Sequence, residues 1–144
     1  LRVLSIRDKG TYEEVIPRLI GTLCTYFSSP QRGSEQVSIT GPFMTIYHDG
    51  EYRECDADVE VAVPVTGRLP DQISGITIRT MPGGRFASAI HKGPYQDVHE
   101  SWGKLYEWTA NQGYEPKSPC RDLYLNDPDD VPEEELLTEL LIPV

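Results

Sequence analysis

Apolar residues recur at helical spacing in two stretches of this chain. Val15 and Leu19 begin a series spaced about one turn apart, which predicts a helix over residues 11–27. A second series starts at Val98 and predicts a helix over residues 95–111, which ends where a Gln-Gly pair follows. The pattern therefore indicates two main helices.

Around these helices lie short segments rich in β-branched and aromatic residues, several of them bounded by Gly or Pro. They predict strands at residues 3–7, 43–48, 59–65, 77–80, 85–90, 122–125 and 136–144. In the third of them, apolar residues alternate with others, as in a strand with two different faces. Strands and helices together predict an α+β fold.

The chain repeats itself. Residues 2–15 align without gaps on residues 85–98, and Arg, Ser, Lys, Gly, Tyr and Val match at six positions. Residues 60–65 and 139–144 close the two halves alike, each with a Glu first and a Pro-Val last. We therefore expect a single domain over residues 1–144 that contains two β-α-β-β repeats, residues 1–65 and 75–144.

A lone β-α-β-β unit has one sheet face covered by its helix and the other face bare. Two copies related by a pseudo-twofold axis can pair their edge strands into one curved antiparallel sheet. Such a duplication predicts a central cleft between the copies, and a cleft of this kind is where a ligand binds.

Charge and size narrow the function classes. The chain has 144 residues and a formal net charge of −10, with 13 basic residues against 23 acidic ones. Because nucleic-acid binding depends on cations at the phosphates, we expect no direct nucleic-acid contact. No apolar run approaches the roughly 20 residues that span a bilayer, so we expect a cytoplasmic protein without membrane contact.

The metal-ligating residue types are scattered. Cys24, Cys55 and Cys120 match neither zinc-ligand spacing nor a disulfide framework, so we expect reduced thiols, with Cys120 buried and unreactive. The three histidines lie in different predicted elements, without acids at ligand spacing. The sequence therefore predicts no metal site and no cofactor.

Two acids occupy equivalent places in the closing strands of the repeats. These are Glu60 and Glu139, and their symmetry suggests a structural role. Pairing with Arg2, Arg85 or Lys92 would serve that role.

Five segments carry a family resemblance: residues 41–48 (Gly-Pro-Phe-Met-Thr-Ile-Tyr-His), 58–65, 91–95 (His-Lys-Gly-Pro-Tyr), 121–128 and 137–144. In this order they resemble the GyrI-like family, the effector-binding domain of AraC-type and MerR-type multidrug regulators, over nearly the whole chain. The resemblance implies the duplicated fold and a cleft lined by aromatic residues around a buried acid. Known relatives bind hydrophobic cations there, inhibit or protect DNA gyrase, or hydrolyse cyclopropane-containing toxins.

The resemblance assigns the acid to Asp122. This strand reads Arg-Asp-Leu-Tyr-Leu where the family has Arg-Glu-Val-Tyr-Leu, and the shorter side chain draws the carboxylate back by roughly 1.5 Å. An ionised carboxylate in an aromatic cleft is costly, and a cationic ligand would compensate it. The alternative is a structural acid paired with Arg121 or another cation.

Strand periodicity places Tyr124 on the face of Asp122, and the duplication makes Thr45 and Tyr47 their counterparts. Rings of the second helix are further candidates, although core packing is the alternative for every aromatic residue. The expected ligand-binding residues are Asp122, Tyr124, Tyr47, Thr45, Phe43, Trp102 and Tyr106.

Three functions are compatible with this pattern. The first is binding of amphipathic, cationic small molecules by a drug or toxin sensor, which a DNA-binding domain would precede, or by a sequestering protein. The second is a hydrolase of reactive toxins, with Asp122 as acid or base and Tyr124 assisting. The third is an interaction protein that modulates DNA gyrase.

Overall fold

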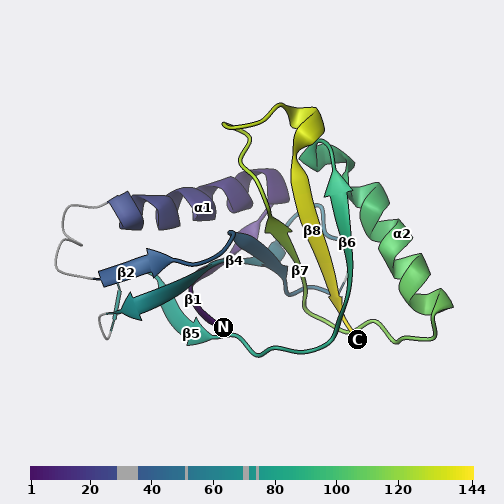
Figure 1. The fold of residues 1–144 in the computed structure, drawn as a ribbon, viewed down its shortest axis with the longest axis horizontal. Coiled ribbons are helices and arrows are strands. Elements are labelled where there is room, and N and C mark those ends of the chain that lie inside the picture. Colours follow the sequence, from purple (N-terminus) through teal and green to yellow (C-terminus); the bar gives the residue numbers. More distant parts are fainter. Residues whose placement is uncertain (29–35, 51, 70–71, 74) are drawn as a thin grey trace. The chain divides into compact units, whose positions relative to one another are not determined.

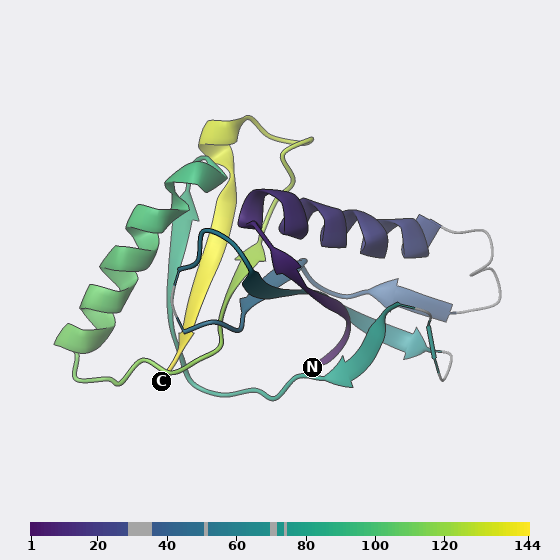
Figure 2. The same cartoon turned by 180° about the vertical axis from the view of Figure 1, so that it is seen from behind.

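The structure is a computed structural model that describes residues 1–28, 36–50, 52–69, 72–73 and 75–144. Within these residues, strands outnumber helices. The chain divides into two units, Leu1–Gly83 and Gly84–Val144. Each unit has an antiparallel sheet and one long helix, which Figures 1 and 2 show from opposite sides. The predicted α+β class with two main helices is confirmed.

The first unit is built on the long strand β4. Its elements are β1 (Arg2–Gly10), α1 (Tyr12–Ser28), β2 (Gln36–Ile39), β3 (Met44–Tyr47), β4 (Ala57–Arg68) and β5 (Thr77–Thr80). The strands pair antiparallel in the order β5-β1-β4-β3, and β2 pairs with the last part of β4.

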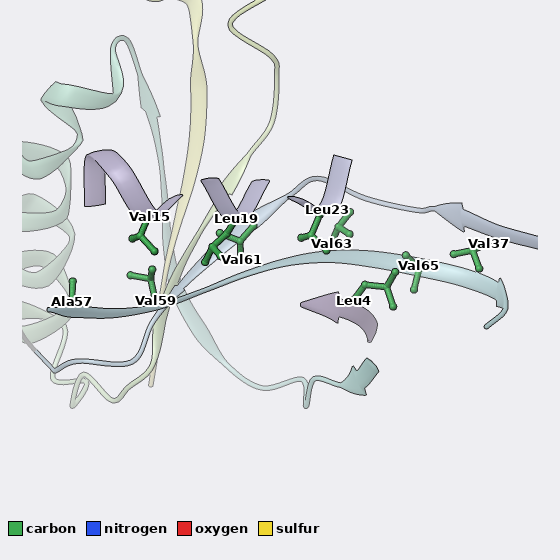
Figure 3. Packing of buried hydrophobic residues seen from close by; sticks show 10 residues of the cluster. All are labelled: Leu4, Val15, Leu19, Leu23, Val37, Ala57, Val59, Val61, Val63 and Val65. Carbon is green, nitrogen blue, oxygen red and sulfur yellow. The ribbon is translucent and has the colours of Figure 1, made fainter. Parts of the chain in front are cut away.

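One face of this sheet packs against α1. Val15, Leu19 and Leu23 are the buried residues of the helix and recur every four positions, so they form one stripe. Alternate valines of β4 point toward that stripe in Figure 3. The buried cluster comprises Leu4, Val15, Leu19, Leu23, Val37, Ala57, Val59, Val61, Val63 and Val65.

The second unit repeats the plan with a shorter first and a shorter last strand. Its elements are β6 (Phe86–Lys92), the 3-10 turn η2 (Tyr95–Asp97), α2 (Val98–Asn111), β7 (Cys120–Tyr124), the 3-10 turn η3 (Glu133–Glu135) and β8 (Leu137–Pro143). The strands are antiparallel in the order β7-β8-β6. Leu140 and Ile142 of β8 pack with Leu105 of α2 in a buried cluster.

The strand register is the same in both units. Thr45 of β3 pairs with Val61 of β4, and Asp122 of β7 pairs with Leu140 of β8. The sequence repeat matches these pairs residue for residue, so the duplication extends to the register of the strands.

Three details differ from the expected elements. The short strand β2 was not predicted, and β4 runs to Arg68 because β2 pairs with the residues beyond 65. Strand β5, expected at the start of the second repeat, pairs with β1 and belongs to the first unit. The stop signals expected after the first helix, at residues 29–34, lie outside the described residues. Among the described residues, no helix is long and apolar enough to cross a membrane.

Candidate functional site

Asp122 lies on the α2 face of its sheet. Its cross-strand partner Leu140 packs beneath α2, and paired residues of neighbouring strands point to the same face. Only 3% of Asp122 is exposed. Strand alternation therefore carries an acidic side chain into the layer between sheet and helix, where Cys120 and Tyr124 point as well.

Two tyrosine rings accompany this acid. The rings of Tyr95, in η2, and Tyr124 meet edge to face with centroids 5.6 Å apart. Tyr95 is 36% exposed, and the partial burial of its ring raises its pKa, as do the negative charges of Asp127 and Asp122. Asp122 is therefore close enough to Tyr95 for its charge to act on the phenol.

Tyr95 was missing from the expected site, although the sequence contained the signal. Tyr95 aligns with Tyr12 in the repeat, and Tyr124 aligns with Tyr47. The rings of Tyr12 and Tyr47 also meet edge to face, with centroids 5.8 Å apart. Each repeat thus builds the same tyrosine pair between the start of its helix and a strand that follows the helix, β3 in the first unit and β7 in the second.

The predicted rings of α2 lie along the same helix face. The centroids of Trp102 and Tyr106 are 6.2 Å apart, and Trp102 packs partly buried against the cluster of Leu105. The Tyr106 hydroxyl lies 2.9 Å from the Cys120 sulfur, which ties the helix to β7. Tyr106 is 41% exposed, so only part of its ring is buried. Loss of water contact raises the pKa of both groups, and the contact with Cys120 raises that of Tyr106 further. Cys120 is buried, as expected.

The three candidates from the first unit lie on the α1 face of their sheet. Thr45 is fully buried opposite Val61. Phe43 and Tyr47 are partly buried and pack against the cluster beneath α1. The first unit therefore keeps the aromatic surroundings but has a neutral hydroxyl where the second unit has a carboxylate.

The arrangement in the second unit suits a positively charged aromatic or alkyl group. A carboxylate attracts the charge, and ring faces bind both apolar surface and cations. No cluster of three potential metal ligands exists among the described residues.

A family description, the GyrI-like small molecule binding domain, matches residues 1–144. The chain belongs to the GyrI-like family. Membership identifies it as a small-molecule-binding domain.

Proteins similar to this GyrI-like domain include a named gyrase inhibitor and a chain solved in complex with DNA. It is 29% identical to a DNA gyrase inhibitor of Yersinia enterocolitica over 134 residues, which cover 88% of this chain and 81% of the relative. It also matches EcmrR in an EcmrR–DNA complex with a TM-score of 0.81 and 26% identity. That match covers 99% of this chain but only 53% of the EcmrR chain, so the domain spans about half of that regulator.

A more distant structure shares the fold. SAV2435 bound to tetraphenylphosphonium matches with a TM-score of 0.59 and 14% identity, over 100% of this chain and 88% of SAV2435. At this identity the likeness concerns the fold alone.

Proposed function

We propose that this GyrI-like domain binds amphipathic, cationic small molecules, and that Asp122 supplies the charge that selects cations. One observation carries the proposal: a carboxylate, only 3% exposed, lies in an aromatic layer of a small-molecule-binding domain. Tyr124, Trp102 and Tyr106 of the same unit would supply ring contacts to the ligand. The remaining expected residues, Tyr47, Thr45 and Phe43, belong to the first unit.

The selectivity follows from electrostatics. Ionising a carboxylate away from water is costly, and a cation brought next to it recovers part of that cost. A neutral ligand of the same shape gains only the contact with the rings. We therefore expect the domain to bind a cation more tightly than its neutral analogue. The ring contacts themselves should accept apolar groups of different shapes.

The fold is compatible with such a ligand. SAV2435, which has the same fold, was solved with tetraphenylphosphonium, a lipophilic cation with four aromatic rings. We transfer that ligand class to this chain because buried Asp122 would provide charge and the ring pair of Tyr95 and Tyr124 would provide ring contact within one unit.

Calorimetric titration with tetraphenylphosphonium and its neutral analogue triphenylphosphine oxide tests the proposal. The wild type should bind the cation more tightly, and Asp122→Asn should weaken cation binding at least tenfold, about 1.4 kcal/mol, with little change for the neutral compound. Asp122→Glu keeps the charge and restores the family residue, so it should retain cation binding.

Asp58→Asn is the matched control, because Asp58 is a partly buried acid paired with Arg7 and is not among the expected ligand residues. It should bind the cation like the wild type. Circular dichroism melting verifies that each variant is folded. Equal cation affinity in the wild type and in folded Asp122→Asn would refute the role of Asp122.

A second candidate function is modulation of DNA gyrase, which the Yersinia relative favours through its name and its coverage of 88% of this chain. The purified domain should then inhibit supercoiling by gyrase in a gel assay, and Asp122→Asn should inhibit equally if the ligand site is not involved. Unchanged supercoiling at a large excess of the domain would exclude this function.

A further inference from the structure

The first unit contains a second polar site, on the sheet face opposite α1. Glu60 lies there because Val59 and Val61, its neighbours in β4, face α1. Its carboxylate is 4% exposed and accepts hydrogen bonds from Arg79 Nε (2.8 Å) and a terminal nitrogen of Arg79 (2.7 Å). The expectation that Glu60 pairs with Arg2, Arg85 or Lys92 is wrong, because β5 brings Arg79 next to β1 and β4.

Further donors saturate this carboxylate. His48 Nε2 lies 2.9 Å from Oε1, and the Ser5 hydroxyl also bonds to the carboxylate. Burial raises the pKa of Glu60, but the hydrogen bonds from Arg79, Ser5 and His48 outweigh burial and hold the pKa below its usual value. Glu60 is therefore ionised at neutral pH and has no capacity left to hold a ligand cation.

A pocket of about 370 Å³ opens beside this ion pair. It is lined by Ser5, Arg7, His48, Glu60, Thr77 and Arg79, all from the first unit. Ligand pockets in proteins span about 300–1,000 Å³, so this one has room for a small organic molecule.

The lining offers hydrogen-bond donors beyond those already used. Arg7 directs Nε and one terminal nitrogen at Asp58, at 2.8 and 2.6 Å, just as Arg79 does at Glu60. Within the described part of the chain, the other terminal nitrogen (Nη1) of each arginine makes no hydrogen bond or ion pair. Each guanidinium is held in place by its carboxylate, and both arginines line the pocket.

The strand register itself does not require these cations. Arg7 pairs across the strands with Glu60, and at the equivalent place of the second unit Ile90 pairs with Glu139. Leu125 stands where the repeat would place the counterpart of His48. The second unit thus keeps the same register without the cationic side chains, which argues against a purely structural clamp.

We propose that this pocket binds a small organic anion. The Nη1 groups of Arg7 and Arg79 and the Thr77 hydroxyl would donate hydrogen bonds to its carboxylate or phosphate oxygens. Planar guanidinium groups match both kinds of oxygen acceptor. This ligand differs in charge from the cation proposed for Asp122, so either proposal can hold without the other.

Titration of the ¹⁵N-labelled protein with inorganic phosphate and with succinate, at constant ionic strength kept with sodium chloride, tests the pocket. We expect saturable amide shifts around Arg7, His48 and Thr77 at millimolar concentrations with at least one of the two probes. Response to phosphate alone or to succinate alone identifies which acceptor the pocket prefers.

Arg7→Ile, which copies the second repeat, should weaken binding at least fivefold. Arg18→Ile is the matched control, because Arg18 is exposed to the same extent as Arg7 (56% against 55%) and also pairs with an aspartate, Asp8. Thr77→Val removes a donor without changing charge and should weaken binding as well. The proposal is overturned if neither probe gives saturable shifts, or if Arg18→Ile weakens binding as much as Arg7→Ile.

Discussion

Two arginines of the first unit make the same two-bond contact with a carboxylate at different depths. Arg79 contacts Glu60 at 2.8 and 2.7 Å, and Arg7 contacts Asp58 at 2.8 and 2.6 Å. In the first pair, 33% of the Arg79 side chain and 6% of the Glu60 side chain are exposed. In the second pair, 55% of the Arg7 side chain and 18% of the Asp58 side chain are exposed. Since the geometry is equal, burial should decide how much each pair stabilises the fold.

We expect Arg79→Ile to lower the free energy of unfolding by about 2 kcal/mol. Removing one partner of a fully buried pair costs roughly 3–5 kcal/mol. That cost is reduced here, because Arg79 is one-third exposed and because His48 and Ser5 still donate to the carboxylate. Arg7→Ile breaks a more exposed pair and should cost less than about 1 kcal/mol.

Urea unfolding followed by circular dichroism measures both variants against the wild type. The pKa of Glu60 is lowered in the folded state, so the pair stabilises the fold above the ordinary pKa of 4.5 and loses this effect as pH falls through the folded-state value. The difference between the wild type and Arg79→Ile should therefore be full at pH 7 and shrink in acid. Equal costs for the two variants at pH 7, or an Arg79 effect that does not change down to the acid limit of folding, would refute this reasoning.

Two further predictions concern backbone conformation and thiol burial. Gly93 has φ +130° between β6 and η2, so Gly93→Ala should destabilise the protein by about 1–3 kcal/mol, whereas Gly103→Ala, inside α2 with open space at its Cβ, should stabilise it by about 0.5–1 kcal/mol. Thermal melting distinguishes them by opposite shifts of the midpoint; shifts of the same sign would contradict the prediction. Cys24 and Cys55 are exposed while Cys120 is buried with a raised pKa, so a colorimetric thiol reagent at pH 8 should react with two thiols per native chain and with three in urea. Rapid reaction of all three in the native protein would contradict the burial of Cys120.

The sequence predicted the elements whose signal is local. The helical stripe that begins at Val15 and the alternating valines of β4 mark one buried face each, and both elements formed as expected. Strand β2 has four residues and no comparable pattern, because its position depends on pairing with β4. The partner of Glu60 was also unpredictable. Arg79 reaches Glu60 only because β5 pairs with β1, and these two strands are far apart in the sequence.

The candidate site shows the same division. Asp122 and Tyr124 followed from strand alternation and resemblance, and the side chains of both point toward the α2 face. Tyr95 was not among the expected residues, which came from the strands and from the middle of the second helix. The alignment of Tyr95 with Tyr12 indicated that Tyr95 contacts Tyr124 as Tyr12 contacts Tyr47, because aligned residues occupy equivalent places when the strand register is the same.

The conserved register also explains how one architecture acquires two kinds of polar site. A slip of one residue would turn every buried valine of β4 to the opposite face, so the apolar pattern fixes the pairing strongly. Single positions can then change charge without moving the backbone. On the helix face, Thr45 of the first unit corresponds to Asp122 of the second. On the opposite face, Arg7 of the first unit corresponds to Ile90 of the second. At positions where the two repeats share a register but differ in charge, the strand pairing thus does not dictate the charge. A ligand is the simplest reason for a charge at such a position, which is why Asp122 and Arg7 are the residues to substitute first.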